Sequence, residues 1–168
     1  ALYRAGCVYG QFKEGEAVVD LLLERGAQPD IFVAATFAMT ERVEELLAEN
    51  EGLARSADPD GMTALHWAVR PRRANGPERP CQVTKLLLDA GADEQAIDPT
   101  EEGMLPIHHV GAWGAAYPEQ ADLLLAHGAN VNAKSEVGWT PLDYAIDLSR
   151  VDIAEHLKAR GGKESGKR

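Results

Sequence analysis

Cysteine, basic residues and long apolar runs are all scarce in this sequence. Its 168 residues include two cysteines and 17 Lys and Arg against 27 Asp and Glu, which gives a formal net charge of −10. Nucleic acids and anionic membranes both present phosphates, so this charge argues against either as a partner. No apolar run approaches the ~18 residues that span a membrane, and no signal peptide is visible.

The sequence motifs of common catalytic and metal-binding sites are also missing. The patterns H-E-x-x-H, C-x-x-C, G-x-S-x-G and the Walker sequence do not occur. We therefore expect no catalytic residue, no metal site and no cofactor. An intrinsic hydrolase would require an activity that no cluster of residues here explains.

A six-residue segment recurs along the chain. Its best copy is T-P-L-D-Y-A at residues 140–145, and the others are T-A-L-H-W-A at 63–68, L-P-I-H-H-V at 105–110, D-I-F-V-A-A at 30–35 and a partial copy at 1–5. An apolar helical run follows each copy. A unit that repeats in this way cannot bury its own hydrophobic face, so the copies must stack into a solenoid.

These segments resemble the T-P-L-H-x-A signature of the ankyrin repeat, whose period is ~33 residues. The step from Ala35 to Ala68 has this length. The resemblance implies a mainly α fold, an α-solenoid of about five stacked helix-turn-helix repeats with short β-hairpin fingers. We expect the repeats at approximately residues 1–29, 30–57, 58–97, 98–134 and 135–160, with the first truncated, and a polar flexible tail at 161–168.

Capping and turn residues predict where the helices begin and end. The first helices are expected to begin near Asp30, Thr63, Leu105 and Thr140, since Asp and Thr accept orphan backbone N–H groups. The second helices are expected to end near Gly26, Gly91, Gly128 and Gly161, because glycine suits the position after a helix. Fingers are expected at Asp58–Gly61, Asp98–Gly103 and Ser135–Gly138. Between Gly26 and Ala35 there is room only for a tight turn.

The histidines and cysteines have structural interpretations. His66 and His108 occupy the signature position, whose side chain in ankyrin repeats hydrogen-bonds to backbone; the resemblance therefore implies that they tie each helix start to the neighbouring finger. Cys7 and Cys81 lie two repeats apart, near ~20 Å in a stack of helices. A disulfide needs Cα atoms within ~7 Å. Two free thiols are typical of the reducing cytosol, so we expect a cytoplasmic protein.

Two columns of side chains are candidate binding residues. Met62, Met104 and Trp139 each lie between a finger glycine and a helix start, so stacking aligns them at the fingertips. Trp67, His109 and Tyr144 match one another on the first helix, which lines the concave face in this family. For the fingertip residues the alternative is that ankyrin repeats tolerate single apolar residues at this position. For the first-helix residues the alternative is that they pack between neighbouring repeats.

The inter-helix loop of the third repeat is a further candidate. It carries Arg70, Arg72, Arg73 and Arg79 in an otherwise acidic protein, and Trp113 follows in the next loop along the same edge. Arginine and aromatic residues are enriched at interface anchors, and function concentrates on loops. The alternative is a solvated loop.

The resemblance implies a non-enzymatic module that binds a protein partner through its fingers and first helices, as an adaptor, inhibitor or escort, probably as a monomer. This assignment rests on analogy at the level of the fold. The alternative is a regulatory or targeting ankyrin segment of a larger protein with another domain upstream.

Overall fold

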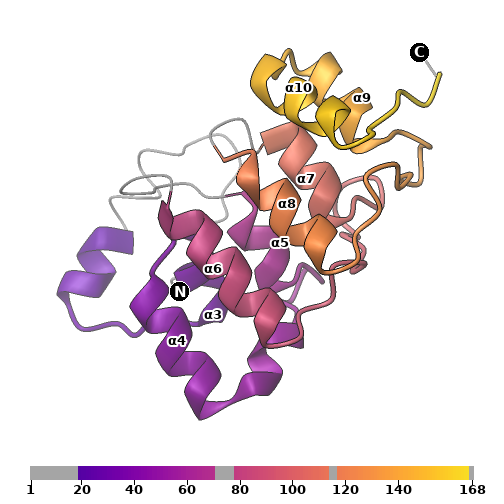
Figure 1. Cartoon of the computed structure of the whole chain (residues 1–168). Helices are drawn as coiled ribbons and strands as arrows, with labels where there is room; N and C mark the ends of the chain where they lie inside the picture. The colour runs from indigo at the N-terminus through magenta and orange to yellow at the C-terminus, as the bar shows by residue number, and fades with distance from the viewer. Residues whose placement is uncertain (1–18, 71–77, 114–116, 167–168) are drawn as a thin grey trace.

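The chain forms a stack of paired helices. The computed structural model describes residues 19–70, 78–113 and 117–166 (Figure 1). Residues 19–24 are helical, and the elements that follow are α3 (Ile31–Thr36), α4 (Thr40–Glu49), η1 (Glu51–Arg55), α5 (Ala64–Ala68), α6 (Glu78–Asp89), α7 (Pro106–Trp113), α8 (Glu119–Ala126), α9 (Pro141–Asp147) and α10 (Val151–Ala159). Within the described residues, no helix combines the length and the apolar character that crossing a membrane requires.

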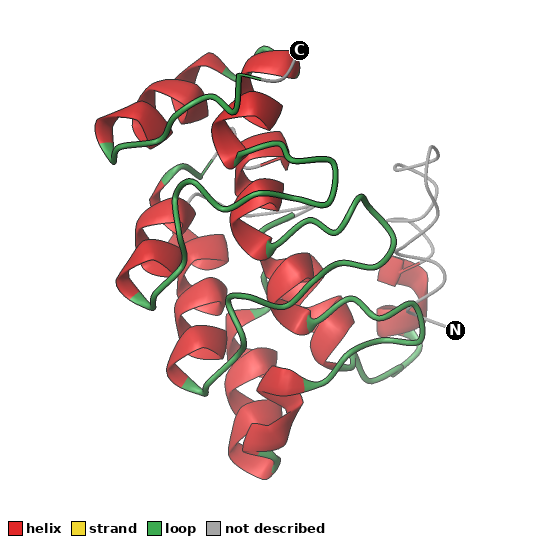
Figure 2. Cartoon of the chain, turned by 90° about the vertical axis from the view of Figure 1, so that its right-hand side faces the viewer, coloured by secondary structure: helices red, strands yellow, loops and turns green. Residues whose placement is uncertain are grey.

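The helices form two layers. The first helices pack in order, α3 on α5, α5 on α7 and α7 on α9, while α4 packs on α6 and α6 on α8. Figure 2 shows this stack with the loops between repeats running along one side. Four helix pairs are described, and of the expected first repeat the described part is residues 19–29, of which 19–24 are helical. The α-solenoid predicted from the repeats is confirmed.

Helix starts lie where the capping residues predict them. The Asp30 side chain accepts a hydrogen bond from the Val33 N–H, and Thr63 and Thr140 accept from the third residue of α5 and α9. Pro141 opens α9, where its missing N–H costs nothing. Leu105 has no hydroxyl to offer, and its own N–H is accepted by Nδ1 of His108 at 3.0 Å.

Glycine ends the second helices as expected. Gly91 has φ +81° and Gly128 has φ +108°. These backbone conformations are unfavourable for residues with a side chain but not for glycine. After α6, the Gly91 N–H donates to the Leu88 carbonyl and the Ala92 N–H donates to Leu87, both at 2.9 Å. These bonds satisfy carbonyls that a helix end leaves without partners.

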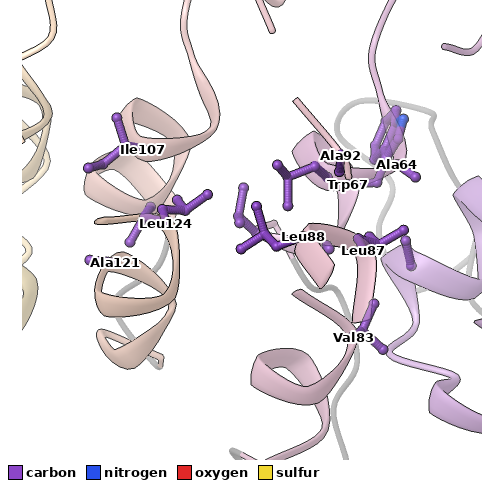
Figure 3. Close-up of a cluster of buried hydrophobic side chains, with 14 of the residues drawn as sticks. Ala64, Trp67, Val83, Leu87, Leu88, Ala92, Ile107, Ala121 and Leu124 are labelled. Carbon is purple, nitrogen blue, oxygen red and sulfur yellow. The ribbon is translucent and has the colours of Figure 1, made fainter. Parts of the chain in front are cut away.

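The hydrophobic core runs along the stack between the two layers. Leu87 of α6, Ile107 of α7 and Leu124 of α8 are fully buried. Figure 3 shows side chains of neighbouring helices, among them Leu87, Leu88 and Ile107, gathered in this core. Each repeat therefore covers the apolar face of the next one.

The fingers are turns closed by short-range bonds. In each one the first residue donates its N–H to the carbonyl of the last: Asp58 to Met62, Asp98 to Met104 and Ser135 to Trp139, at 2.8–2.9 Å. Only isolated bridges, Ala57 with Thr63 and Asp98 with Met104, occur in the described chain. The expected β-hairpins are thus reduced to single bridges, because each finger has too few residues for a ladder.

A buried polar pair fixes each finger to the first helix of its own repeat. The Trp67 indole N–H donates to Asp58 Oδ2 at 2.8 Å, and the Tyr144 hydroxyl donates to Ser135 Oγ at 3.0 Å. In the repeat between them, Nε2 of His109 lies 3.0 Å from Asp98 Oδ2, although its N–H is poorly aligned with the carboxylate. We call these three pairs the finger locks; each replaces water at a buried finger base.

The signature histidines join consecutive repeats. Nδ1 of His66 accepts from the Thr63 N–H at 3.1 Å, and its Nε2 donates at 3.1 Å to the carbonyl of Ala96, which leads into the next finger. His108 repeats this arrangement, with Nε2 donating to the Ala133 carbonyl at 3.0 Å. The structural role that the resemblance implied for both histidines agrees with these bonds. An accepting Nδ1 requires that the ring be neutral.

The C-terminal tail is held in place of a next finger, which differs from the flexible tail expected for residues 161–168. Asp143 stands at the signature histidine position of the last repeat, and its carboxylate accepts from the Ser165 N–H at 3.1 Å. The Thr140 hydroxyl donates to the Lys163 carbonyl at 2.8 Å, and the Lys163 N–H donates to Asn132 at 2.7 Å. A polar composition did not reveal these backbone partners.

The first prediction tests the core. Replacing Leu87 or Leu124 with alanine is expected to lower the free energy of unfolding by ~2–5 kcal/mol, because each substitution leaves a cavity in the stack. Val151→Ala is the control, since Val151 is 64% exposed whereas both leucines are 0% exposed. Urea denaturation measures the difference. Equal midpoints for all three variants would contradict the stacking described here.

The second prediction concerns pH. Burial lowers the pKa of His66 and His108, and burial, partly offset by Asp98, lowers the pKa of His109 to about 3. Between each folded pKa and the unfolded value of about 6.5, only the unfolded chain binds the proton. Stability should therefore be full above about pH 6.5 and fall as the pH decreases towards 5.5, by about 1 kcal/mol for His109.

The carboxyl group of Glu101 changes the stability in the opposite direction as the pH falls, and variants separate its effect from that of the histidines. Burial and the charge of Glu102 raise the pKa of Glu101, so protonation of Glu101 in the folded chain adds stability as the pH falls. The urea midpoint should still be lower at pH 5.5 than at pH 7.5, and His66→Gln should make this difference smaller. His127→Gln is the control at an exposed ring. A flat midpoint over this range would show that the buried rings are not held neutral.

Candidate protein-interaction groove

A groove of about 680 Å³ opens between two neighbouring fingers. One wall is the 98–104 finger, the other is the 135–139 finger, and the ends of α7 and α9 lie between them. The lining residues are Thr100, Glu101, Glu102, Met104, Ala112, Trp113, Val137, Trp139, Tyr144, Asp147 and Leu148. The groove therefore combines aromatic and aliphatic side chains with three carboxylates.

Exposed apolar side chains concentrate at this groove. Seven large hydrophobic side chains are exposed in the described part of the chain, and three of them line it: Trp113 at 42%, Val137 at 44% and Leu148 at 40%. Single exposed hydrophobic residues are ordinary, but a contiguous set with a polar rim is typical of a binding surface.

Direct contacts hold the two walls in register. Glu102 has φ +52°, a conformation that non-glycine residues rarely adopt. Its carbonyl accepts from the Glu136 N–H at 2.9 Å, and its carboxylate accepts from the Tyr144 hydroxyl at 2.8 Å. A side chain at Gly103 would approach Glu136 Cγ to 2.3 Å, so glycine permits this contact between fingers. The walls are thus fixed before any ligand binds.

The aromatic floor is held by the last finger lock. The Trp139 and Tyr144 rings meet edge to face, with centroids 5.1 Å apart, and Tyr144 also packs against His108 at 5.8 Å. Burial, together with the nearby Glu102 and Glu101 charges, raises the pKa of Tyr144 to about 12, despite the opposing bond to Ser135. The hydroxyl therefore stays protonated, and it lies within hydrogen-bonding distance of both Glu102 and Ser135.

A buried polar network adjoins the groove. Arg70 donates to Glu101 at 3.2 Å, and its guanidinium packs over the rings of Trp67 and Trp113, 5.9 and 5.2 Å from their centroids. Burial opposes ionisation of Asp98, but the close His109 ring and hydrogen bonds from Thr100 outweigh it and hold the pKa of Asp98 below its usual range. This network anchors the base of the 98–104 finger.

Asp98, Glu101 and His109 are the described residues that could hold a metal ion. Their ligand atoms all lie within 4.8 Å of one another. However, Asp98 approaches Nε2 of the imidazole while Glu101 lies 3.9 Å from Nδ1, so the two carboxylates face different nitrogens. Arg70 already neutralises Glu101 and would repel a cation. The finger-lock position of His109, shared with Trp67 and Tyr144, explains these contacts without a metal.

The structure distributes the predicted binding residues unevenly. Trp113, Trp139, Tyr144 and Met104 come together in the groove, with Met104 only 3% exposed at its floor. Met62 and Trp67 lie elsewhere and are also buried, so neither methionine has much surface to offer a partner. The reason is that the finger turn directs these side chains towards the helices.

The basic loop is only partly described. Arg72 and Arg73 lie outside the described residues. The Arg70 side chain is 10% exposed, so it has little surface to offer a partner. Arg79 is exposed and pairs with Glu41 at 3.5 Å.

The acidic lining was not predicted as a site. Glu101 and Glu102 fall within the two extra residues by which the 98–104 finger exceeds its neighbours, and Asp147 and Leu148 follow the last signature segment. The greater length of this finger was the one signal in the sequence. Its consequence, carboxylates brought beside Trp139 and Tyr144, depends on contacts between repeats.

Comparison with known proteins agrees with this architecture. A family profile of ankyrin repeats (three copies) matches residues 74–165, more than half of the chain. The sequence is 36% identical over 107 residues to human SH3 and multiple ankyrin repeat domains protein 2, covering 63% of this chain and 5% of that protein. It is 35% identical over 108 residues to the mouse B-cell lymphoma 3 protein homolog, covering 64% and 21%.

A third relative is the mouse RelA-associated inhibitor, 41% identical over 89 residues, which covers 45% of this chain and 11% of that protein. The chain thus spans only about a fifth or less of the length of these relatives. Ankyrin repeats are generic modules for protein interaction. The paired helices, the signature histidines and the matched family profile show that this chain belongs to the ankyrin-repeat family.

Proposed function

We propose that this chain is a non-enzymatic protein-binding module, an adaptor, inhibitor or escort, that holds a segment of a partner protein in the groove between the 98–104 and 135–139 fingers. The observation that carries the proposal is the concentration of exposed Trp113, Val137 and Leu148 at one groove with prearranged walls. A preformed site loses less conformational entropy on binding than a flexible one.

The finger locks support this proposal. Trp139 offers a large rigid surface at low entropic cost, and Tyr144 holds its ring edge to face. Arg72 and Arg73 belong to the same proposal as residues that steer an acidic part of the partner, with more effect on association rate than on affinity. A monomeric, cytoplasmic protein is also part of it, consistent with the unpaired thiol of Cys81.

A second candidate is a regulatory or targeting role within a larger protein. It is favoured by the relatives, which carry the matched repeats in much longer chains. In either case the partner is expected in the same groove. An upstream catalytic or membrane domain in the gene would favour this second candidate.

The third prediction tests the groove. A partner identified by pull-down and mass spectrometry is expected to bind Trp139→Ala more weakly by ~2 kcal/mol or more, as is typical when a central aromatic anchor is truncated. Leu148→Asp should also weaken binding, because it places a charge on the apolar lining. Isothermal titration calorimetry measures both affinities.

Val151→Asp is the matched control for Leu148→Asp. Val151 is also exposed but does not line the groove. Circular dichroism melting confirms that each variant is folded. If Trp139→Ala and Leu148→Asp bind as tightly as the original chain, the partner docks on another surface and the proposed groove is wrong.

A further inference from the structure

The charges around the groove are unbalanced. Three carboxylates line it, Glu101, Glu102 and Asp147, and none of the described lining residues is basic. Arg70 neutralises Glu101, and Glu102 accepts the Tyr144 hydroxyl without losing its charge. Asp147 is exposed and forms no ion pair with any described residue. Two negative charges thus face an apolar space without a cation in the lining.

Helix ends add to this negative potential. Both α7 and α9 end at the groove, where Ala112, Trp113, Asp147 and Leu148 line it. The last carbonyls of a helix carry partial negative charge and favour cations. Arg150 shows this attraction within the molecule, since its Nε donates to the Ala112 carbonyl at 3.3 Å. Arg150 itself lies outside the groove lining.

The carboxylates of Glu101 and Glu102 also repel each other. The pKa of Glu101 is raised by burial and by the charge of Glu102. An additional cation between the fingers would relieve this repulsion.

The chain itself shows how an arginine fits here. At the edge of the groove, the Arg70 guanidinium contacts a carboxylate of the 98–104 finger and packs over Trp113 at the same time. The groove interior repeats these elements, with the carboxylates of Glu102 and Asp147 beside the Trp139 and Tyr144 rings. A planar guanidinium both stacks on aromatic rings and binds carboxylates, which an ammonium group does less well.

We infer that the groove receives an arginine side chain from a basic segment of the partner protein, with its guanidinium between the carboxylates and its aliphatic stem on the apolar lining. This inference rests on the proposed function and specifies its ligand. It assigns Asp147, rather than the paired Glu101, as the carboxylate that the incoming arginine neutralises.

A displayed library of random twelve-residue peptides provides the probe. Peptides selected on the original chain are counter-selected on Trp139→Ala, which leaves those that need the groove. We expect these peptides to share an arginine at a common position. A synthetic copy with citrulline, the uncharged isostere of arginine, should bind at least about tenfold more weakly, because charge-assisted hydrogen bonds are lost.

Paired variants locate the charge. Asp147→Asn should weaken binding of the arginine peptide several-fold and leave the citrulline peptide unaffected. Asp152→Asn, the same change at an exposed position of α10 outside the lining, should alter neither. Fluorescence polarisation at low and high salt measures the affinities, and salt should weaken only the arginine peptide.

The outcomes separate this inference from the function on which it rests. Groove-dependent peptides that lack a basic residue, or that bind equally well with citrulline, would overturn the arginine assignment and leave the groove as the binding site. If every selected peptide binds Trp139→Ala as tightly as the original chain, none needs the groove, and the groove itself is overturned.

Discussion

The structure depends on one constraint: no repeat can satisfy its own buried groups. The first helices are short, from five residues in α5 to eight in α7, so neither their apolar faces nor their backbone ends can be covered within a repeat. The next repeat completes them. Nε2 of His66 reaches the Ala96 carbonyl, and the buried Gln120 of α8 donates to the Ala68 carbonyl at the end of α5. Stability in such a stack is a property of interfaces between neighbours.

The same constraint positions the groove. Because each finger is tied at its base by a buried pair and at its side by the following repeat, the fingers extend as fixed walls. Glu102 is where this is most evident, since its backbone and carboxylate both bind the next repeat while its φ remains in a sparsely populated region. Backbone strain of this kind persists only where surrounding contacts determine it. Binding residues on such walls need little reorganisation when a partner arrives.

Much of the fold, and less of the site, could be predicted from the sequence. Helix starts could be predicted from the capping side chains of Asp30, Thr63 and Thr140, and helix ends from Gly91 and Gly128. These boundaries depend on local sequence and need no tertiary information. The burial of Met62 and Met104 could not be predicted, because a position in a turn does not determine which way its side chain points. Docking of the tail could not be predicted, because Asp143 binds Ser165, 22 residues further along the chain. Glu101 and Glu102 become part of the groove only because stacking of the repeats places them beside the next finger.

The indole N–H signals of ¹⁵N-labelled tryptophan test the central claim most directly. The chain has three tryptophans: Trp139 and Trp113 line the groove, while the Trp67 indole is buried and bound to Asp58. On titration with a bound partner segment, the account predicts that the Trp139 and Trp113 signals shift together and saturate while the Trp67 signal stays in place. A shift of Trp67 with Trp139 and Trp113 unchanged would show that the partner binds elsewhere and that the groove is not the site.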